Sequence, residues 1–183
     1  YLDHLPARHD ATLNLFHHAI DRDLATADWL ANYLVEHAAN SLAADIASAT
    51  MATVRGEYDT AAELYLKALN SKEIDSDERF DYALKYIEVM SELGRFVEAL
   101  EQLPNRRQII DWELEEWLDY PARTNEEYRQ MIELGLAETP HDKQLIESLV
   151  ELLIKRGELP QALKLMESHI ELVEGEAKGA KPQ

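Results

Sequence analysis

Cysteine is absent from this chain of 183 residues, which excludes disulfide bonds, zinc–thiolate sites and thiol-based catalysis. Glycine and proline are scarce, with six of each, too few for a disordered or all-β chain. No run approaches the roughly 18 consecutive apolar residues that a transmembrane helix requires. The whole chain is 46% hydrophobic and 30% charged, which is enough apolar material for one sizeable core.

Positive charge is also in short supply. Eighteen lysines and arginines are set against 36 aspartates and glutamates, so the formal net charge is −18. This balance opposes binding to nucleic-acid phosphates, which requires a surplus of basic side chains, and it disfavours attraction to anionic membrane surfaces. Two interpretations stay open: an acidic surface that keeps the protein in solution, or one that selects basic partners.

Three of the six glycines, Gly56, Gly94 and Gly157, occur in the same local setting. Each follows an apolar helical run and begins the pattern glycine, polar residue, bulky apolar residue, two further residues, alanine. Glycine is the residue best suited to the left-handed cap that ends a helix, and a second helical run starts directly after it. A glycine turn that recurs between paired helices indicates a helical solenoid.

Apolar residues recur with helical spacing along most of the chain, and no segment shows the strict alternation of a strand. The sequence therefore predicts an all-α protein. Pro6 is expected to delay the first helix, so residues 1–9 form a lead-in before it. Pro140 is expected in the first turn of its helix. Residues 175–183 have no apolar face and are expected to be disordered. The expected helices cover about 10–20, 24–38, 41–55, 58–70, 76–93, 96–103, 106–119, 125–138, 141–156 and 160–173.

The clearest copy of the repeated pattern covers residues 42–71. Its residues follow the order small, glycine, aromatic, alanine, aromatic, alanine, at Ala49, Gly56, Tyr58, Ala61, Tyr65 and Ala68. This order resembles the tetratricopeptide repeat (TPR) family, in which small residues allow the two helices of a pair to cross closely. More divergent copies begin near Phe80, Ile109 and Lys143.

The resemblance implies a right-handed solenoid of antiparallel helix hairpins, about ten helices in one domain over residues 10–174. Residues 10–38 are interpreted as a capping helix pair, since terminal repeats are atypical, and residues 42–173 as about four divergent repeats. A non-repetitive helical bundle built from similar hairpins is the alternative. The short helix ending at Leu103-Pro104 and the hairpin that closes the chain also resemble the TPR array of bacterial thioredoxin-fused co-chaperones, although no thioredoxin segment is present here.

The histidines and carboxylates show no spacing that predicts catalysis or a metal site. His17 and His18 are adjacent and diverge by about 100° on a helix, while His37 and His169 are isolated. Acidic pairs such as Glu115-Glu116 are typical of solvated helix faces, and the sequence has no glycine-rich phosphate loop and no Gly-x-Ser-x-Gly elbow. We therefore expect a protein that is not an enzyme, with no catalytic residues and no bound metal or cofactor.

The TPR resemblance also implies where a partner would bind, because the first helix of each hairpin lines the concave groove in that family. Members that clamp a C-terminal carboxylate use lysine, asparagine and arginine there, whereas this sequence has Ile46, Thr50 and then mostly acids. A basic or amphipathic segment is expected instead, with apolar contact to Trp117 and Tyr120. The alternative is binding at the convex face or an edge. The residues expected in the groove are Asp81, Lys85, Glu88, Glu92, Glu113, Trp117, Tyr120, Gln144, Glu147, Glu151 and Lys155.

These features predict a protein–protein interaction module, a scaffold or co-chaperone-like adaptor whose partner is another protein or a peptide. A regulatory or sensor domain of a larger multidomain protein and a self-assembling structural scaffold are the alternatives. No nucleic-acid binding and no membrane insertion are expected. We interpret the chain, which begins at Tyr1 without methionine, as a processed chain or a piece of a larger protein. The expected compartment is the cytoplasm, and a processed periplasmic or extracytoplasmic chain is the alternative.

Overall fold

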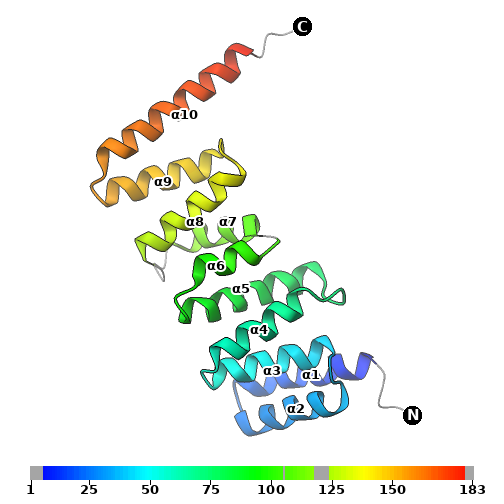
Figure 1. The fold of residues 1–183 in the computed structure, drawn as a ribbon. Helices are drawn as coiled ribbons and strands as arrows, with labels where there is room; N and C mark the ends of the chain where they lie inside the picture. Colours follow the sequence, from blue (N-terminus) through cyan, green and yellow to red (C-terminus); the bar gives the residue numbers. More distant parts are fainter. Residues whose placement is uncertain (1–5, 105, 118–123, 180–183) are drawn as a thin grey trace. The chain divides into compact units, whose positions relative to one another are not determined.

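The protein is all-helical, as the sequence predicts. The computed structural model describes residues 6–104, 106–117 and 124–179, with side chains described for 9–104, 106–114 and 124–170. These residues form ten α-helices and, over the same ranges, no strand (Figure 1). The chain divides into two compact units, Tyr1–Leu103 and Pro104–Gln183. The single domain expected over residues 10–174 stays a prediction.

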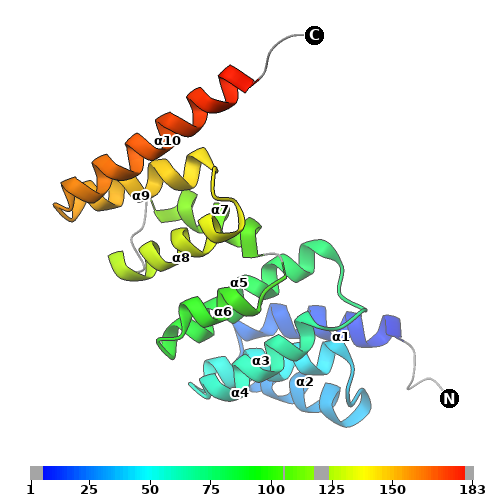
Figure 2. The same cartoon turned by 45° about the horizontal axis from the view of Figure 1, so that its top comes forward.

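The first unit consists of six helices, each packed against the next along the chain, and α1 also contacts α3. Neighbouring helices reverse direction across short connections, so that α3 and α4 lie side by side as a hairpin (Figure 2). The six helices are α1 (Pro6–Ile20), α2 (Leu24–His37), α3 (Leu42–Val54), α4 (Tyr58–Leu69), α5 (Ser76–Glu92) and α6 (Phe96–Gln102).

The second unit contains four helices, and here too each helix contacts its neighbour along the chain. Its core is formed by buried aliphatic and aromatic side chains, among them Ile109 on the first helix, Tyr128 on the second and Leu152 on the third. Burial of such side chains is the main force that holds a helix pair together. The helices are α7 (Arg106–Trp117), α8 (Asn125–Glu138), α9 (Lys143–Lys155) and α10 (Leu159–Gly179).

The glycine turns adopt the conformation that their sequence pattern predicts. Gly56 has φ of 73°, Gly94 of 68° and Gly157 of 77°. At Gly56 the amide of Glu57 donates to the carbonyl of Ala52 at 2.9 Å, and the Gly56 amide donates to Thr53 at 3.0 Å. The same pair of bonds closes the other two turns. Together with the positive φ, these bonds define the Schellman motif, which satisfies carbonyls left free at a helix end.

Small residues set the spacing within the α3–α4 hairpin. Ala49 and Ala61 are completely buried, and they allow the two helices to approach closely. The Tyr65 side chain, 2% exposed, extends from α4 to α3, where its hydroxyl lies 3.1 Å from the Thr50 hydroxyl. Ala49, Ala61 and Tyr65, three residues of the repeated pattern, are therefore part of the packing surface of this hairpin.

Within the described residues, three helix boundaries differ by more than one residue from those expected. Pro140 lies outside α9, because the Asp142 side chain accepts a hydrogen bond from the Leu145 amide and caps a helix that begins at Lys143. The expected lead-in and tail are partly helical, since α1 begins at Pro6 and α10 continues to Gly179. Glutamate, alanine and lysine follow Gly175 and are good helix formers, which agrees with a helix that continues to Gly179. Over the described ranges, no helix combines the length and the hydrophobicity needed to cross a bilayer.

Candidate interaction surfaces

An exposed polar stripe runs along α5, the first helix of its hairpin. Four residues of this helix were predicted to line the groove: Asp81, Lys85, Glu88 and Glu92. They are separated by four, three and four positions, which places them on one helical face. All four side chains are exposed, while Tyr82, Tyr86 and Met90 are buried among the neighbouring helices. The stripe consists of Asp81, Lys85, Glu88 and Glu92.

Two titratable groups show which helices adjoin this stripe. The pKa of His17 on α1 is lowered, first by burial and then by the positive charge of Lys85, with a further contribution from His18. The pKa of Tyr65 is raised, mainly by burial; the Glu88 carboxylate adds to the rise, and hydrogen bonds from threonines oppose it. The α5 stripe therefore lies within electrostatic reach of side chains on both α1 and α4.

Of the three groove residues predicted at and after α7, namely Glu113, Trp117 and Tyr120, the structure describes the side chain of Glu113 alone. The Glu113 side chain is 6% exposed and has an interaction partner, so it does not line an open groove. Trp117 lies at the end of α7, but its side chain and all of Tyr120 fall outside the described residues. Trp112, which precedes Glu113 on α7, is 36% exposed.

A second polar stripe occupies α9, the first helix of the last hairpin. Its four predicted residues, Gln144, Glu147, Glu151 and Lys155, are all exposed. Glu151 pairs with Lys155 at 2.9 Å, and Glu147 lies 3.5 Å from the ammonium of Lys143. Exposed pairs of this kind contribute only about 0–1 kcal/mol, so the fold does not depend on them.

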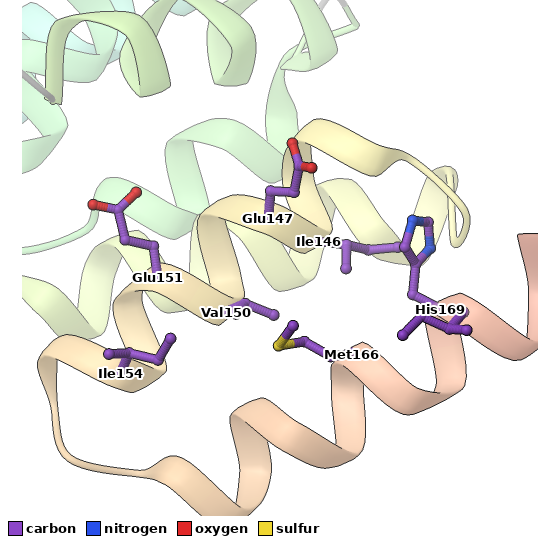
Figure 3. Close-up of a pocket in the computed structure, with 8 residues that line it drawn as sticks. Ile146, Glu147, Val150, Glu151, Ile154, Met166 and His169 are labelled. Atoms are coloured by element: carbon purple, nitrogen blue, oxygen red, sulfur yellow. The ribbon is translucent and has the colours of Figure 1, made fainter.

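A groove follows the line along which α9 and α10 meet, and we call it the seam. It has a volume of about 280 Å³. Figure 3 shows Val150 and Met166 directed toward one another across the seam, with the carboxylates of Glu147 and Glu151 on the side of α9 away from α10. The lining residues are Ile146, Glu147, Val150, Glu151, Ile154, Met166, His169 and Ile170.

One face of α10 is apolar and unusually exposed, and two of its residues, Met166 and Ile170, line the seam. On α10 the exposed fractions are 54% for Leu159, 59% for Leu163, 43% for Met166 and 54% for Ile170. These residues recur at intervals of four, three and four and thus share one helical face. On α9, Ile154 is 50% exposed. A contiguous exposed apolar surface of this kind marks a site for interaction rather than a packed core.

The seam also contains a polar atom that has no partner. Nδ1 of His169 is buried and makes no hydrogen bond to any residue that the structure describes. In Figure 3 the His169 ring extends from α10 toward Ile146 at one end of the seam. A buried polar atom without a partner carries a desolvation cost. The seam was not among the surfaces predicted from the sequence; its signal there is the apolar face of α10, whose residues recur with the helical period of about 3.6 residues.

The first unit has two further surface features. A cavity of about 880 Å³ with a mixed polar and apolar lining lies beside the connection between α2 and α3, and Asp10, Glu36 and Glu78 are among its lining residues. On α2, the ring of Tyr33 lies between two other rings in a tilted arrangement. Its centroid is 5.9 Å from that of Trp29, which is 63% exposed, and 4.3 Å from that of His37.

Within the described side chains, no group of three or more His, Asp or Glu could hold a metal ion.

Comparison with known proteins gives no relative. No protein-family model matches the chain, no curated protein matches it, and no solved structure matches it. The helix hairpins and their exposed faces are therefore the basis for the function. The two polar stripes contain Glu88 on α5 and Glu151 on α9.

Proposed function

We propose that this chain is a non-enzymatic protein-interaction module made of TPR-like hairpins, stacked with the right-handed sense of such repeats. Its partner is a protein segment that is basic or amphipathic. The proposal is supported by helices that pack against their neighbours along the chain and by the repeated Schellman turns at Gly56, Gly94 and Gly157. Stacked hairpins present extended surfaces, which suit binding to another protein.

The observation that carries the proposal is the pair of exposed polar stripes on α5 and α9. Both lie on the first helix of a hairpin, the helix that lines the ligand groove in proteins of the resembled family. Each presents carboxylates one or two helical turns apart, such as Glu88 with Glu92 and Glu147 with Glu151. Carboxylates at this spacing match lysine or arginine side chains of a partner, and their charge would mainly raise the association rate and the selectivity.

Affinity capture with the intact chain, followed by mass spectrometry, tests the proposal. The captured partner is then measured against the double variant Glu88→Lys with Glu151→Lys, which reverses one charge in each stripe. We expect affinity to fall about tenfold and the salt dependence of binding to become flatter. Glu113 is excluded from this variant, because a lysine at that buried position would threaten the fold.

A matched control separates the stripes from total charge. Glu63 on α4 and Glu167 on α10 are exposed acids on second helices, one in each unit. The variant Glu63→Lys with Glu167→Lys changes the net charge equally and should bind within about twofold of the wild type. Equal binding by wild type and a folded stripe variant would exclude the stripes as the site. Capture of no specific protein would refute the interaction function itself.

A further inference from the structure

The seam between α9 and α10 has the shape and chemistry of a receptor for a single helix. Its walls are two adjacent helices whose apolar residues recur at helical intervals, with Val150 and Ile154 on one side and Met166 and Ile170 on the other. Between such rows, the ridges of a third helix fit with anchors at intervals of three and four residues. The seam thus matches a ligand with the same periodicity.

The lining of the seam favours a helix over an extended peptide. Its described side chains offer apolar surface, two carboxylates and one imidazole, and α9 and α10 already use their backbone groups for intrahelical hydrogen bonds. An extended strand laid on this surface would bury amide and carbonyl groups without partners. A helix satisfies those groups internally, so it can bury its apolar face at low cost.

Charge determines which helix fits. Among the described side chains, the charged residues that line the seam are Glu147 and Glu151, one helical turn apart on α9, and no described lysine or arginine lines it. Their present partners, Lys143 and Lys155, form exposed pairs that a ligand can replace or share at little cost. A partner helix with lysine or arginine four residues apart beside its apolar stripe would meet both carboxylates.

The same charges disfavour a second copy of this chain as the occupant. Two chains of net charge −18 repel one another. A two-fold arrangement on the seam would also bring Glu147 and Glu151 of each copy against an identical acidic edge, since both copies use the same surface in such a dimer. A basic partner gains from those carboxylates, while an identical partner is penalised by them.

We propose that the α9–α10 seam binds a basic amphipathic helix of another protein. This inference rests on the proposed interaction function and adds a site separate from the α5 stripe. The apolar face of the partner covers Ile154, Met166 and Ile170, and its basic residues pair with the two seam carboxylates.

The test uses the intact chain and a labelled designed peptide of about five helical turns (~18 residues) with leucine along one face and lysine elsewhere. Fluorescence anisotropy should show saturable binding to the wild type. The variant Ile154→Gln with Ile170→Gln should bind about tenfold more weakly, as expected when central apolar contacts are lost. The variant Leu24→Gln with Val35→Gln alters two similarly exposed apolar residues on α2 and should bind as wild type does.

Two control peptides separate the proposal from simple charge attraction. A scrambled peptide of the same composition without an apolar face should bind at least about tenfold more weakly, and so should a peptide with glutamate in place of lysine. Equal binding by the scrambled peptide, or no effect of the seam variant, overturns the proposal. A wild-type dimer that the seam variant abolishes, seen by analytical ultracentrifugation, would overturn it in favour of a second copy.

A further outcome separates the failure of this proposal from the failure of the proposed function. If the wild type binds none of the peptides but captured partners remain sensitive to Glu88→Lys, the seam proposal falls and the interaction function stands. Loss of specific capture by the intact chain would refute both.

Discussion

Arg107 on α7 pairs with Asp142, the residue that caps α9, with Nη2 and Oδ2 2.8 Å apart. The other carboxylate oxygen, Oδ1, accepts the amide N–H of Leu145 at 3.1 Å. Arg107 also donates to the Thr139 hydroxyl at 2.9 Å, so one guanidinium holds both ends of the α8–α9 connection. Burial pushes the pKa of Asp142 upward, but the Leu145 amide and the Arg107 charge outweigh it and hold that pKa below its usual value.

Removing this cap should destabilise the second unit. We expect Asp142→Ala to lower the free energy of unfolding by about 1 kcal/mol, since it removes the acceptor for the Leu145 amide. Asp142→Asn retains an acceptor oxygen and should cost less. Urea denaturation followed by circular dichroism measures both variants. An asparagine variant as unstable as the alanine variant would contradict the role of the cap bond.

The ionised Asp142 side chain should also make the free energy of unfolding depend on pH in the acidic range. Because the folded-state pKa lies below the unfolded value, the contribution is present above about pH 4 and is lost as pH falls through the folded pKa. Asp142→Asn cannot titrate, so its stability should fall less steeply than that of wild type below about pH 4. If the stability of the wild type and that of Asp142→Asn changed with pH in parallel, the folded structure would not favour the ionised form of Asp142.

The lowered pKa of His17 predicts a second dependence of stability on pH, closer to neutral pH. Burial and Lys85 lower its folded-state pKa, so the unfolded chain binds a proton more readily. Stability should therefore decrease as pH falls below about 6.5, and the loss should level off below the folded pKa. His17→Gln should remove this slope, and Lys85→Met should reduce it. Denaturation midpoints between about pH 5 and 7.5 provide the measurement, and an unchanged slope in His17→Gln would contradict it.

Gly56 should tolerate asparagine better than alanine. Its φ is 73°, and a Cβ placed there would meet no atom within 4 Å, so the cost of a side chain is backbone strain alone. We expect Gly56→Ala to lose about 1 kcal/mol of stability, because the left-handed region costs non-glycine residues roughly that much. Gly56→Asn should lose less. Equal stability of the wild type and the alanine variant in urea denaturation would show that the turn readjusts.

Buried and exposed apolar residues of the last hairpin should respond differently to truncation. Leu152 on α9 is completely buried, and Leu152→Ala should cost about 2–5 kcal/mol. Leu163 on α10 is 59% exposed, and Leu163→Ala should change stability by less than about 0.5 kcal/mol. Thermal denaturation separates these outcomes. A large loss at Leu163 would mean that the exposed face of α10 supports the fold.

Sequence patterns predicted the helices well because their signals are local. The 3.6-residue apolar period defines each helix, and glycine at positive φ ends three of them, so the turns at Gly56, Gly94 and Gly157 follow from a few neighbouring residues. Pro140 was wrongly predicted to lie in the first turn of a helix, because two signals for a helix start, Pro140 and Asp142, lie within three residues of each other. The carboxylate of Asp142 caps the helix more effectively than proline begins it, and the start moves to Lys143.

The candidate sites depend on tertiary packing, which single-sequence patterns do not contain. Glu113 and Trp112 are adjacent on α7, yet the acid is buried and the indole is partly exposed, the reverse of what their polarity suggests. The apolar face of α10 has the same period whether a neighbour covers it or not. Only the structure shows that Met166 and Ile170 border an open seam.

The nearest-neighbour packing of the helices has a consequence for how this chain folds. Within each unit the main helix–helix contacts join elements adjacent in sequence, from α1 with α2 to α9 with α10. Such pairs close only short loops before they bury apolar surface, so little chain entropy is lost before contacts form. Proteins with mostly local contacts fold in microseconds to milliseconds. Each hairpin can therefore start to form as soon as its own two helices have left the ribosome, without waiting for the distant end of the chain.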